Sequence, residues 1–193
     1  MSKTNKALRN TIAIIIILAV SVGLGFAYER IAKSLEKSAH PLLYEDFVVK
    51  YSGEYNVPQE LIYAVIKAES GFKIDAVSHA GAIGLMQIMP TTFEDMSNRL
   101  GEETVEGLLY DPETNIKYGT YYLRYLYDMF KEWDLAVAAY NGGLGNVNKW
   151  RENPEYIKDD KIVYIPVEET RNYVKRVNKN KEVYKRLYFS EGN

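Results

Sequence analysis

The chain contains no cysteine, and this absence removes several chemistries at once. Disulfide bonds, thiolate nucleophiles and cysteine-ligated zinc sites are all excluded. Histidine is scarce as well, because only His40 and His79 are present and neither has a partner at ligand spacing. We therefore expect loop or surface positions for both histidines, and neither a metal nor a cofactor in the protein.

An excess of charge of one sign is also lacking. The formal net charge is -2, whereas a nucleic-acid-binding protein is expected to be strongly basic. Alternating strand patterns are nearly absent, and Lys161–Ile165 is the only short candidate. The 193 residues, 47% of them hydrophobic, suffice for one globular domain with an appendage.

A single long apolar run stands near the N-terminus. Thr11–Tyr28 carries no charge, and its eighteen residues would span about 27 Å as a helix, close to the hydrocarbon thickness of a bilayer. Lys3, Lys6 and Arg9 precede the run and Glu29 follows it. This asymmetry predicts a single-pass cell-membrane protein with its N-terminus inside and the remainder of the chain outside.

A cleaved signal peptide is the competing interpretation of residues 1–28, because Gly25–Ala27 offers small residues at cleavage spacing. The protein would then be secreted. The run is longer than most signal cores, so we favour an uncleaved anchor. Residues 29–43 are polar and predict either a helical stalk or a loose tether.

Residues 44–190 read as one mainly helical, all-α domain. Residues 44–55 show apolar positions at helical spacing, and Pro58 suits the first turn of the next helix. That next helix is apolar nearly all round up to Glu69, so we expect it to be buried and central. The other expected helices are one from Asp111 through Phe130, one over Leu135–Tyr140 capped by Asp134, and one from Pro166 to about Tyr188.

Glu69 is the leading candidate for a catalytic residue. A carboxyl group carried into an apolar wall is hard to ionise, because burial disfavours the charged form. Its place at the C-terminal end of a helix acts in the same direction. A carboxyl that keeps its proton near neutral pH is what a general acid requires.

Glu69-Ser70 is followed by Gly84-Leu-Met-Gln-Ile-Met-Pro90 and by Ala138-Ala-Tyr-Asn-Gly-Gly143. In this order the three motifs resemble those of the SLT-type lytic transglycosylases, which are relatives of goose-type lysozyme. The resemblance runs from about Tyr44 to about Tyr188. It implies a lysozyme-like domain that cleaves the β-1,4 bond between N-acetylmuramic acid and N-acetylglucosamine in peptidoglycan.

The resemblance also implies how the bond is cleaved. Asp75, Glu94 and Asp95 lie near Glu69 in sequence, but their spacing commits none of them to the role of second carboxylate. The resembled family works with one glutamate, which acts as acid and then as base. The N-acetyl group of the substrate assists, and the C6 hydroxyl closes an anhydro ring on the muramoyl residue. Contacts to the sugar carry over to Ser70, Ser78, Gln87, Met89, Tyr140, Asn141, Glu169 and Tyr173.

Several of these assignments have a plainer alternative. Ser70 is either a group that orients Glu69 or an ordinary helix-end serine, and Glu168 leaves the choice of Glu169 open. The basic stretch Arg171–Arg186 is best read as a solvated helix face, with attraction to anionic polymers or lipids as the alternative. The tyrosines between residues 118 and 127 are read first as core and second as a sugar platform.

Peptidoglycan strands and, through the anchor, the membrane are thus the expected partners. Two other functions remain open at the level of sequence. One is a hydrolytic goose-type lysozyme that uses a positioned water. The other is a non-catalytic wall-binding component of an envelope apparatus, although such a protein has no use for a carboxyl at position 69.

Overall fold

The computed structural model describes residues 3–105, 107–158 and 161–190. It divides into two compact units, Met1–Pro41 and Leu42–Asn193. Because their relative placement is not determined, each unit is described by itself.

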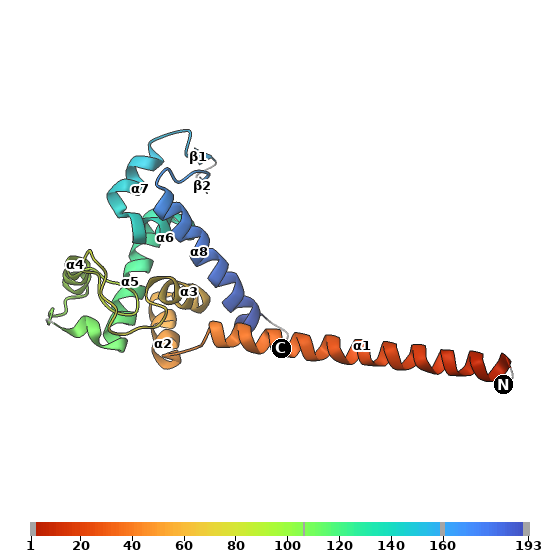
Figure 1. Cartoon of the computed structure of the whole chain (residues 1–193). Helices are drawn as coiled ribbons and strands as arrows, with labels where there is room; N and C mark the ends of the chain where they lie inside the picture. The colour runs from red at the N-terminus through yellow and green to blue at the C-terminus, as the bar shows by residue number, and fades with distance from the viewer. Residues whose placement is uncertain (1–2, 106, 159–160, 191–193) are drawn as a thin grey trace. The chain divides into compact units, whose positions relative to one another are not determined.

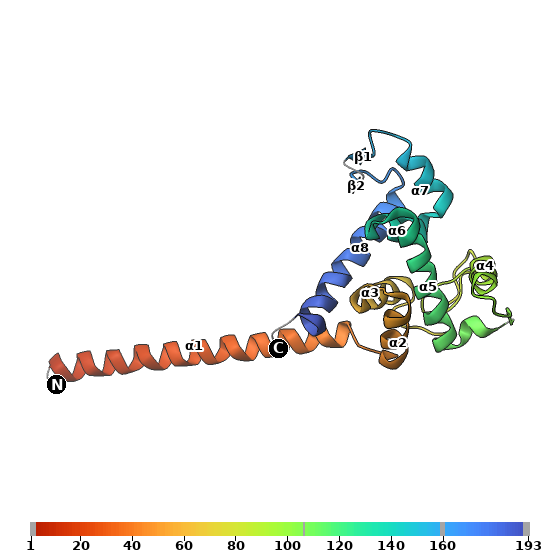
Figure 2. The same ribbon diagram turned by 180° about the vertical axis from the view of Figure 1, so that it is seen from behind.

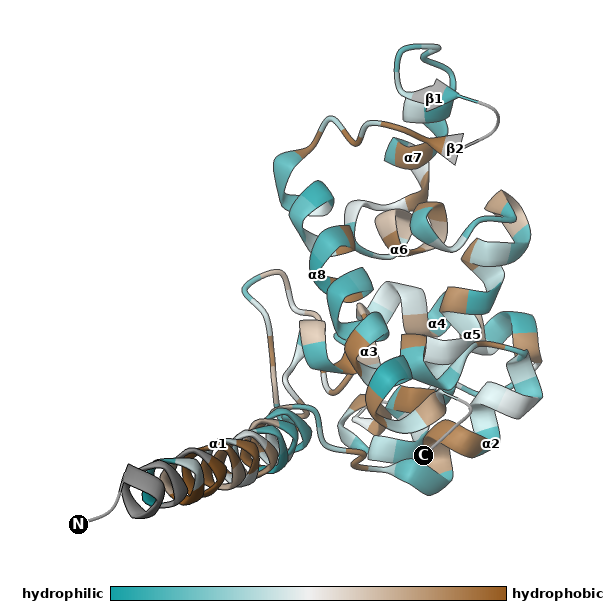
Figure 3. Ribbon diagram, turned by 90° about the vertical axis from the view of Figure 1, so that its right-hand side faces the viewer, coloured by the Kyte–Doolittle hydropathy of each residue, from teal (hydrophilic) through white to brown (hydrophobic). Residues whose placement is uncertain are grey.

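The first unit consists of helix α1, Lys3–Ala39. Its 37 residues correspond to about 55 Å of helix. Large apolar side chains are exposed along it, with Ile17 at 63% and Leu24 at 66% exposure, and Figure 3 shows the apolar middle of the helix in brown. The segment after Tyr28 continues as helix to Ala39, so of the two alternatives for the stalk the structure has the helical one.

Within the described residues, α1 is long and apolar enough from Arg9 to Ala39 to cross a membrane. Signal sequences share these properties, so length and composition alone do not separate an anchor from a signal peptide.

The second unit is built mainly of helices, as predicted. They are joined by loops and by one small hairpin (Figures 1 and 2). The helices are α2 (Glu45–Tyr55), α3 (Gln59–Glu69), α4 (Pro90–Leu100), the 3-10 helix η1 (Leu108–Tyr110), α5 (Pro112–Phe130), α6 (Trp133–Gly142), α7 (Leu144–Arg151), α8 (Glu168–Tyr184) and the π-helical turn η2 (Lys185–Phe189). The antiparallel hairpin pairs β1 (Ile157–Lys158) with β2 (Lys161–Ile162).

Helix α3 forms the centre of the core, in agreement with its apolar sequence. Every residue from Leu61 to Ile66 is at most 1% exposed. The helix packs most extensively against α8, while α2 lies on α5 and α6 touches both α5 and α8. Because α3 is held on several sides, its last residue, Glu69, is fixed relative to α6 and α8.

The Gly84–Pro90 segment is held in place by α5. The buried side chain of Asn115 donates hydrogen bonds to the carbonyls of Ile83 (2.9 Å) and Leu109 (2.8 Å), and accepts one from the Met86 N–H (2.7 Å). Gly84 has φ +79°, and a Cβ there would lie 2.6 Å from the Leu109 carbonyl oxygen. The loop therefore needs both the amide of Asn115 and a residue without a side chain at position 84.

Helix starts agree with the sequence in part. The helix expected from Asp111 is α5, and Asp111 caps it by accepting a hydrogen bond from the Thr114 N–H at 2.8 Å. The predicted capping role of Asp134 is wrong, because α6 already begins at Trp133. The Asp134 carboxylate accepts a hydrogen bond from Asn178 of α8 at 2.9 Å instead, so a tertiary contact replaces the local cap.

Two helices were not expected from the sequence. Helix α4 follows Pro90, and α7 follows Gly143, whose φ is +85°. Figure 2 shows α7 and the hairpin together beyond α6, at one end of the unit, while α4 lies beside α5. Both helices are largely polar, and each buries only two or three side chains.

Candidate active site

Glu69 is the last residue of α3, and the chain turns away directly after it. Gly71 (φ +59°) and Phe72 (φ +71°) both adopt left-handed backbone conformations in this turn. The turn leaves the Glu69 side chain half-buried, between the buried body of α3 and the surface. The acid is thereby carried to the edge of the core on a fixed element.

Tyr173 of α8 holds the Glu69 carboxyl group. Its hydroxyl donates a hydrogen bond to Glu69 Oε1 at 2.6 Å. The Tyr173 side chain is only 1% exposed, so its rotamer is fixed by packing. The two residues are separated by 104 positions in the sequence, and the packing of α3 on α8 brings them together.

The protonation of Glu69 is shifted toward neutral pH. Burial raises the pKa of Glu69 from 4.5 to about 7, although the hydrogen bond from Tyr173 and the positive charge of Arg176 both act to lower it. Burial therefore outweighs the two groups that favour the charged form. At neutral pH this carboxyl exists in both protonation states, which suits a group that first gives and later takes a proton.

Tyr140 lies beside the acid but bonds elsewhere. Its hydroxyl donates to the Met86 carbonyl at 2.7 Å. Burial, and after it the charge of Glu69, raise the pKa of Tyr140 well above its usual value. Tyr140 thus ties α6 to the Gly84–Pro90 segment, and the phenol that donates to Glu69 is Tyr173.

Ser70 and Gln87 shape the site through the backbone. The Ser70 hydroxyl donates to the Leu85 carbonyl at 2.8 Å and accepts from the Phe72 N–H at 3.1 Å, so it ties the end of α3 to the motif loop. Gln87 has φ +50°, and its Nε2 donates to the carbonyls of Ala76 (3.0 Å) and Gly84 (2.9 Å). Both N–H donors of the Gln87 side-chain amide are therefore used by backbone carbonyls between α3 and α4.

The remaining predicted residues lie on exposed positions. Ser78 Oγ accepts a hydrogen bond from the Ala82 N–H at 3.0 Å within a tight turn. Met89 is 36% exposed at the start of α4, and Asn141 is exposed near the end of α6. Glu169 is exposed in the first turn of α8, one turn before Tyr173. The structure brings Glu69, Tyr140 and Tyr173 together, whereas these four residues lie at the surface of the unit.

Within the described parts of the chain, no second carboxylate joins Glu69. Asp75 and Glu94 are exposed, and Asp95 pairs with Arg99 at 3.2 Å. Apart from burial, the groups among these residues that shift the pKa of Glu69 are Tyr173, through its hydrogen bond, and Arg176, through its charge. The site therefore has one acid rather than the usual pair of carboxylates.

Sequence reasoning missed Asn115, although a signal was available. Asn115 is 1% exposed and stands next to the fully buried Ile116, on the core-facing side of α5. A polar residue on the apolar stripe of an amphipathic helix has to find buried partners. The Ile83 and Leu109 carbonyls and the Met86 N–H are those partners.

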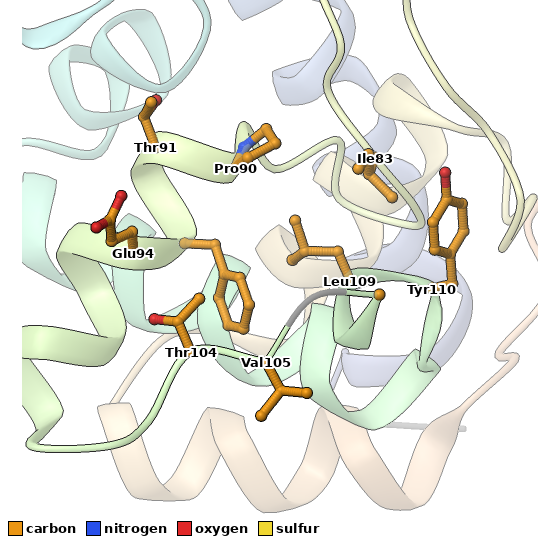
Figure 4. Close-up of a pocket in the computed structure, with 10 residues that line it drawn as sticks. Ile83, Pro90, Thr91, Glu94, Thr104, Val105, Leu109 and Tyr110 are labelled. Carbon is orange, nitrogen blue, oxygen red and sulfur yellow. The ribbon is translucent and has the colours of Figure 1, made fainter.

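A separate pocket of about 660 Å³ lies next to the Gly84–Pro90 segment. Its walls are formed by Ile83 and Pro90, by Phe93 and Glu94 of α4, and by residues 104–105 and 107–110 (Figure 4). The walls are mainly apolar, and Glu69, Tyr140 and Tyr173 do not line it. The pocket is therefore distinct from the acid site.

Residues 46–163 match the family model described as Transglycosylase SLT domain. The chain belongs to this family. Among curated relatives, this SLT chain is 38% identical over 143 residues to the soluble lytic murein transglycosylase of Escherichia coli K12, covering 71% of this chain and 22% of the relative. It is 34% identical over 182 residues to the membrane-bound lytic murein transglycosylase C of Actinobacillus pleuropneumoniae, covering 82% and 49%.

The chain thus spans between about a fifth and a half of the length of these relatives. A solved structure of the lytic transglycosylase Slt of Pseudomonas aeruginosa is also similar, with a TM-score of 0.72 and 31% identity over 80% of this chain and 26% of that one. That protein is described as an inactive variant in which a glutamate is replaced by glutamine. The likeness confirms the predicted mainly helical, lysozyme-like SLT fold.

Proposed function

We propose that this chain cleaves the β-1,4 bond between N-acetylmuramic acid and N-acetylglucosamine in bacterial peptidoglycan without using water, with residues 44–190 as the catalytic domain. The observation that carries the proposal is the half-buried Glu69, which accepts a hydrogen bond from Tyr173 and whose pKa is raised to about 7 by burial. Membership of the SLT family and the names of its relatives support the same activity.

In the first step Glu69 is the general acid. Its protonated carboxyl gives a proton to the glycosidic oxygen as the bond to the anomeric carbon breaks. The carboxylate that forms is stabilised by the Tyr173 hydroxyl, which already donates to Oε1. With no second carboxylate beside Glu69 among the described residues, the N-acetyl group of the substrate is the group that supports the anomeric carbon, as in substrate-assisted glycosidases.

In the second step Glu69 is the general base. Its carboxylate takes the proton from the C6 hydroxyl of the muramoyl residue, and the C6 oxygen bonds to the anomeric carbon. The product is a 1,6-anhydro ring, and Glu69 regains its proton. A hydroxyl held on the same sugar competes well with water because its effective concentration is high. Burial helps this step as well, since a raised pKa makes the carboxylate a better base.

The predicted substrate contacts divide into two groups. Met89, Asn141, Ser78 and Glu169 are exposed and are proposed to contact the sugars directly. Gln87 is proposed to offer only its Oε1 to a sugar hydroxyl, because its Nε2 is held by two backbone carbonyls. Ser70 is proposed to act through the loop that it ties to α3.

Helix α1 is proposed to anchor the enzyme in the cell membrane with the catalytic unit outside. The support is the apolar run within Arg9–Ala39 and the three basic residues before Thr11, a stretch that contains no acidic residue. The similarity to membrane-bound lytic murein transglycosylase C points in the same direction. Cleavage of residues 1–28 as a signal peptide is the outcome that N-terminal sequencing of the mature protein would reveal.

The test of the proposed function is the release of soluble fragments from purified peptidoglycan by the wild type and by Glu69→Gln. The amide keeps the shape of the side chain but donates no catalytic proton, so we expect a loss of at least about a hundredfold. Glu60→Gln is the matched control, because Glu60 lies in the first turn of the same helix and should leave the rate unchanged. Activity of Glu69→Gln within a few-fold of the wild type would contradict the proposal.

A further inference from the structure

Arg176 stands next to the acid site without belonging to any predicted motif contact. It follows Tyr173 by three residues on α8 and is exposed. Its guanidinium carbon lies 5.4 Å from the centre of the Tyr173 ring. The hydroxyl of that same ring donates to Glu69 at 2.6 Å. A cation, an aromatic ring and the acid therefore form one connected group.

Three other arginines of the unit have polar partners, whereas Arg151, like Arg176, lies over an aromatic ring, that of Phe130. Arg99 pairs with Asp95, Arg124 pairs with Asp128, and Arg171 donates to the Ile165 carbonyl. Among the described residues, Arg176 makes no hydrogen bond or ion pair and is held only on the ring face of Tyr173. An arginine suits this place, because its planar guanidinium stacks on an aromatic face while keeping its charge.

The acid at this site has to change its charge during the reaction. When Glu69 gives its proton to the leaving oxygen, a negative charge appears in a half-buried position, and burial opposes that charge. A cation that is already in place lowers this cost without any rearrangement.

Four other charged side chains lie on the segments next to Glu69 and Tyr173. Lys67 of α3, Lys73 and Asp75 of the following loop, and Glu169 of α8 occupy neighbouring segments. In the described structure, none of these four moves the pKa of Glu69, whereas the charge of Arg176 lowers it. From α6 the facing titratable group is Tyr140, which stays neutral near pH 7 because burial raises its pKa.

We propose that Arg176 is a positioning residue for the acid step: its guanidinium, held on the ring of Tyr173, stabilises the Glu69 carboxylate that forms as the proton passes to the glycosidic oxygen. This inference rests on the proposed function of Glu69. It adds a residue that acts through its charge and through Tyr173, without contact with the reacting atoms.

The experiment compares the pH dependence of the initial rate of peptidoglycan cleavage in the full-length wild type, Arg176→Gln, Arg176→Lys and Lys179→Gln. Loss of the positive charge raises the pKa of Glu69, so the protonated acid persists to higher pH. At a partly exposed site, one charge several ångströms away corresponds to about half a pH unit. We expect the alkaline limb of the Arg176→Gln profile to move upward by about that amount, and its maximal rate to fall about threefold because the acid is weaker.

Arg176→Lys keeps the charge and should return the limb toward the wild-type position. Lys179→Gln removes the same charge one turn further along α8, at another exposed position, and should leave the profile unchanged. If the alkaline limb of the pH–rate profile does not shift in Arg176→Gln, the inference is overturned. An equal shift in Arg176→Gln and Lys179→Gln would also overturn it, because such a shift would show a general effect of net charge. If Arg176→Gln fails to fold, as judged by circular dichroism, the comparison of Arg176→Lys with the wild type decides, and a limb more than half a unit higher overturns the inference. These results leave the proposed function intact, since that function fails only if Glu69→Gln retains activity.

Discussion

Replacing Glu69 with glutamine should remove the activity and at the same time stabilise the fold at alkaline pH. Burial raises the pKa of Glu69 to about 7, whereas the carboxyl in the unfolded chain ionises near 4.5. The folded state therefore binds the proton more tightly than the unfolded state does. The stability linked to this proton is fully present below pH 4.5 and is lost as the pH rises to about 7.

The size of the effect follows from the difference between the two pKa values. Each pKa unit corresponds to about 1.4 kcal/mol, so the ionised Glu69 costs the folded state about 3 kcal/mol above pH 7. Glutamine never ionises and avoids this cost. For a domain of this size about 1 kcal/mol shifts the melting temperature by about 2–4 °C. We therefore expect the melting temperature of Glu69→Gln minus that of the wild type to be about 6–12 °C larger at pH 8.5 than at pH 4.5.

Thermal unfolding of the two full-length proteins at pH 4.5 and pH 8.5 is the measurement. All other titrating groups are shared, so their contributions cancel when the difference between variant and wild type is compared at the two pH values. Glu60→Gln, in the first turn of the same helix, serves as the control. If the difference between Glu69→Gln and wild type is the same at both pH values, Glu69 ionises normally in the folded state, and the argument for a general acid at this position is refuted.

Three further predictions concern the site and its support. Tyr173→Phe removes the hydrogen bond to the Glu69 carboxylate and should lower the cleavage rate about tenfold with little change in melting temperature near pH 5, which activity and unfolding assays on the same preparation would check. Gly84→Ala should destabilise the unit by about 3 kcal/mol or more, because a Cβ has no room there. Gly81 also has a positive φ but faces open space, so Gly81→Ala should cost about 1 kcal/mol. Denaturant unfolding of both variants separates steric overlap from backbone strain. A chain beginning at Leu42 should be soluble without detergent, helical by circular dichroism and active, and insolubility or a strand-dominated spectrum would contradict the boundary.

Elements with a strong apolar pattern could be predicted from the sequence. Helix α3 is apolar nearly all round and is the buried centre of the unit, and α5 begins after its Asp111 cap. Helix α7 was missed because it is short and polar, whereas α4 carries Phe93 and Met96 at helical spacing, an apolar signal that was overlooked. Asp134 looked like a cap because Asp commonly caps helices, but the amide of Asn178 from α8 takes its carboxylate.

The candidate acid could be chosen from the sequence, but the hydrogen-bond partners of the site residues could not. Glu69 stands out as a carboxyl at the end of an apolar helix, and the motifs placed Tyr173 near the cleft. Which hydroxyl donates to the acid depends on how α3 packs on α8, and no local pattern encodes a contact across 104 residues. The same holds for Ser70, whose hydroxyl bonds the Leu85 carbonyl, and for Gln87, whose amide is used within its own loop.

In the proposed mechanism Glu69 acts as acid and then as base, and the C6 hydroxyl of the muramoyl residue is the nucleophile. The most direct measurement is mass spectrometry of the fragments released from purified peptidoglycan in water labelled with oxygen-18. The proposed mechanism predicts fragments with anhydro-muramoyl ends, about eighteen mass units lighter than the hydrolysed fragments, and no incorporated label. It also predicts that a metal chelator leaves the rate unchanged. Labelled oxygen at the new reducing ends would show that water is the nucleophile, and a hydrolytic lysozyme-type mechanism would then replace this one.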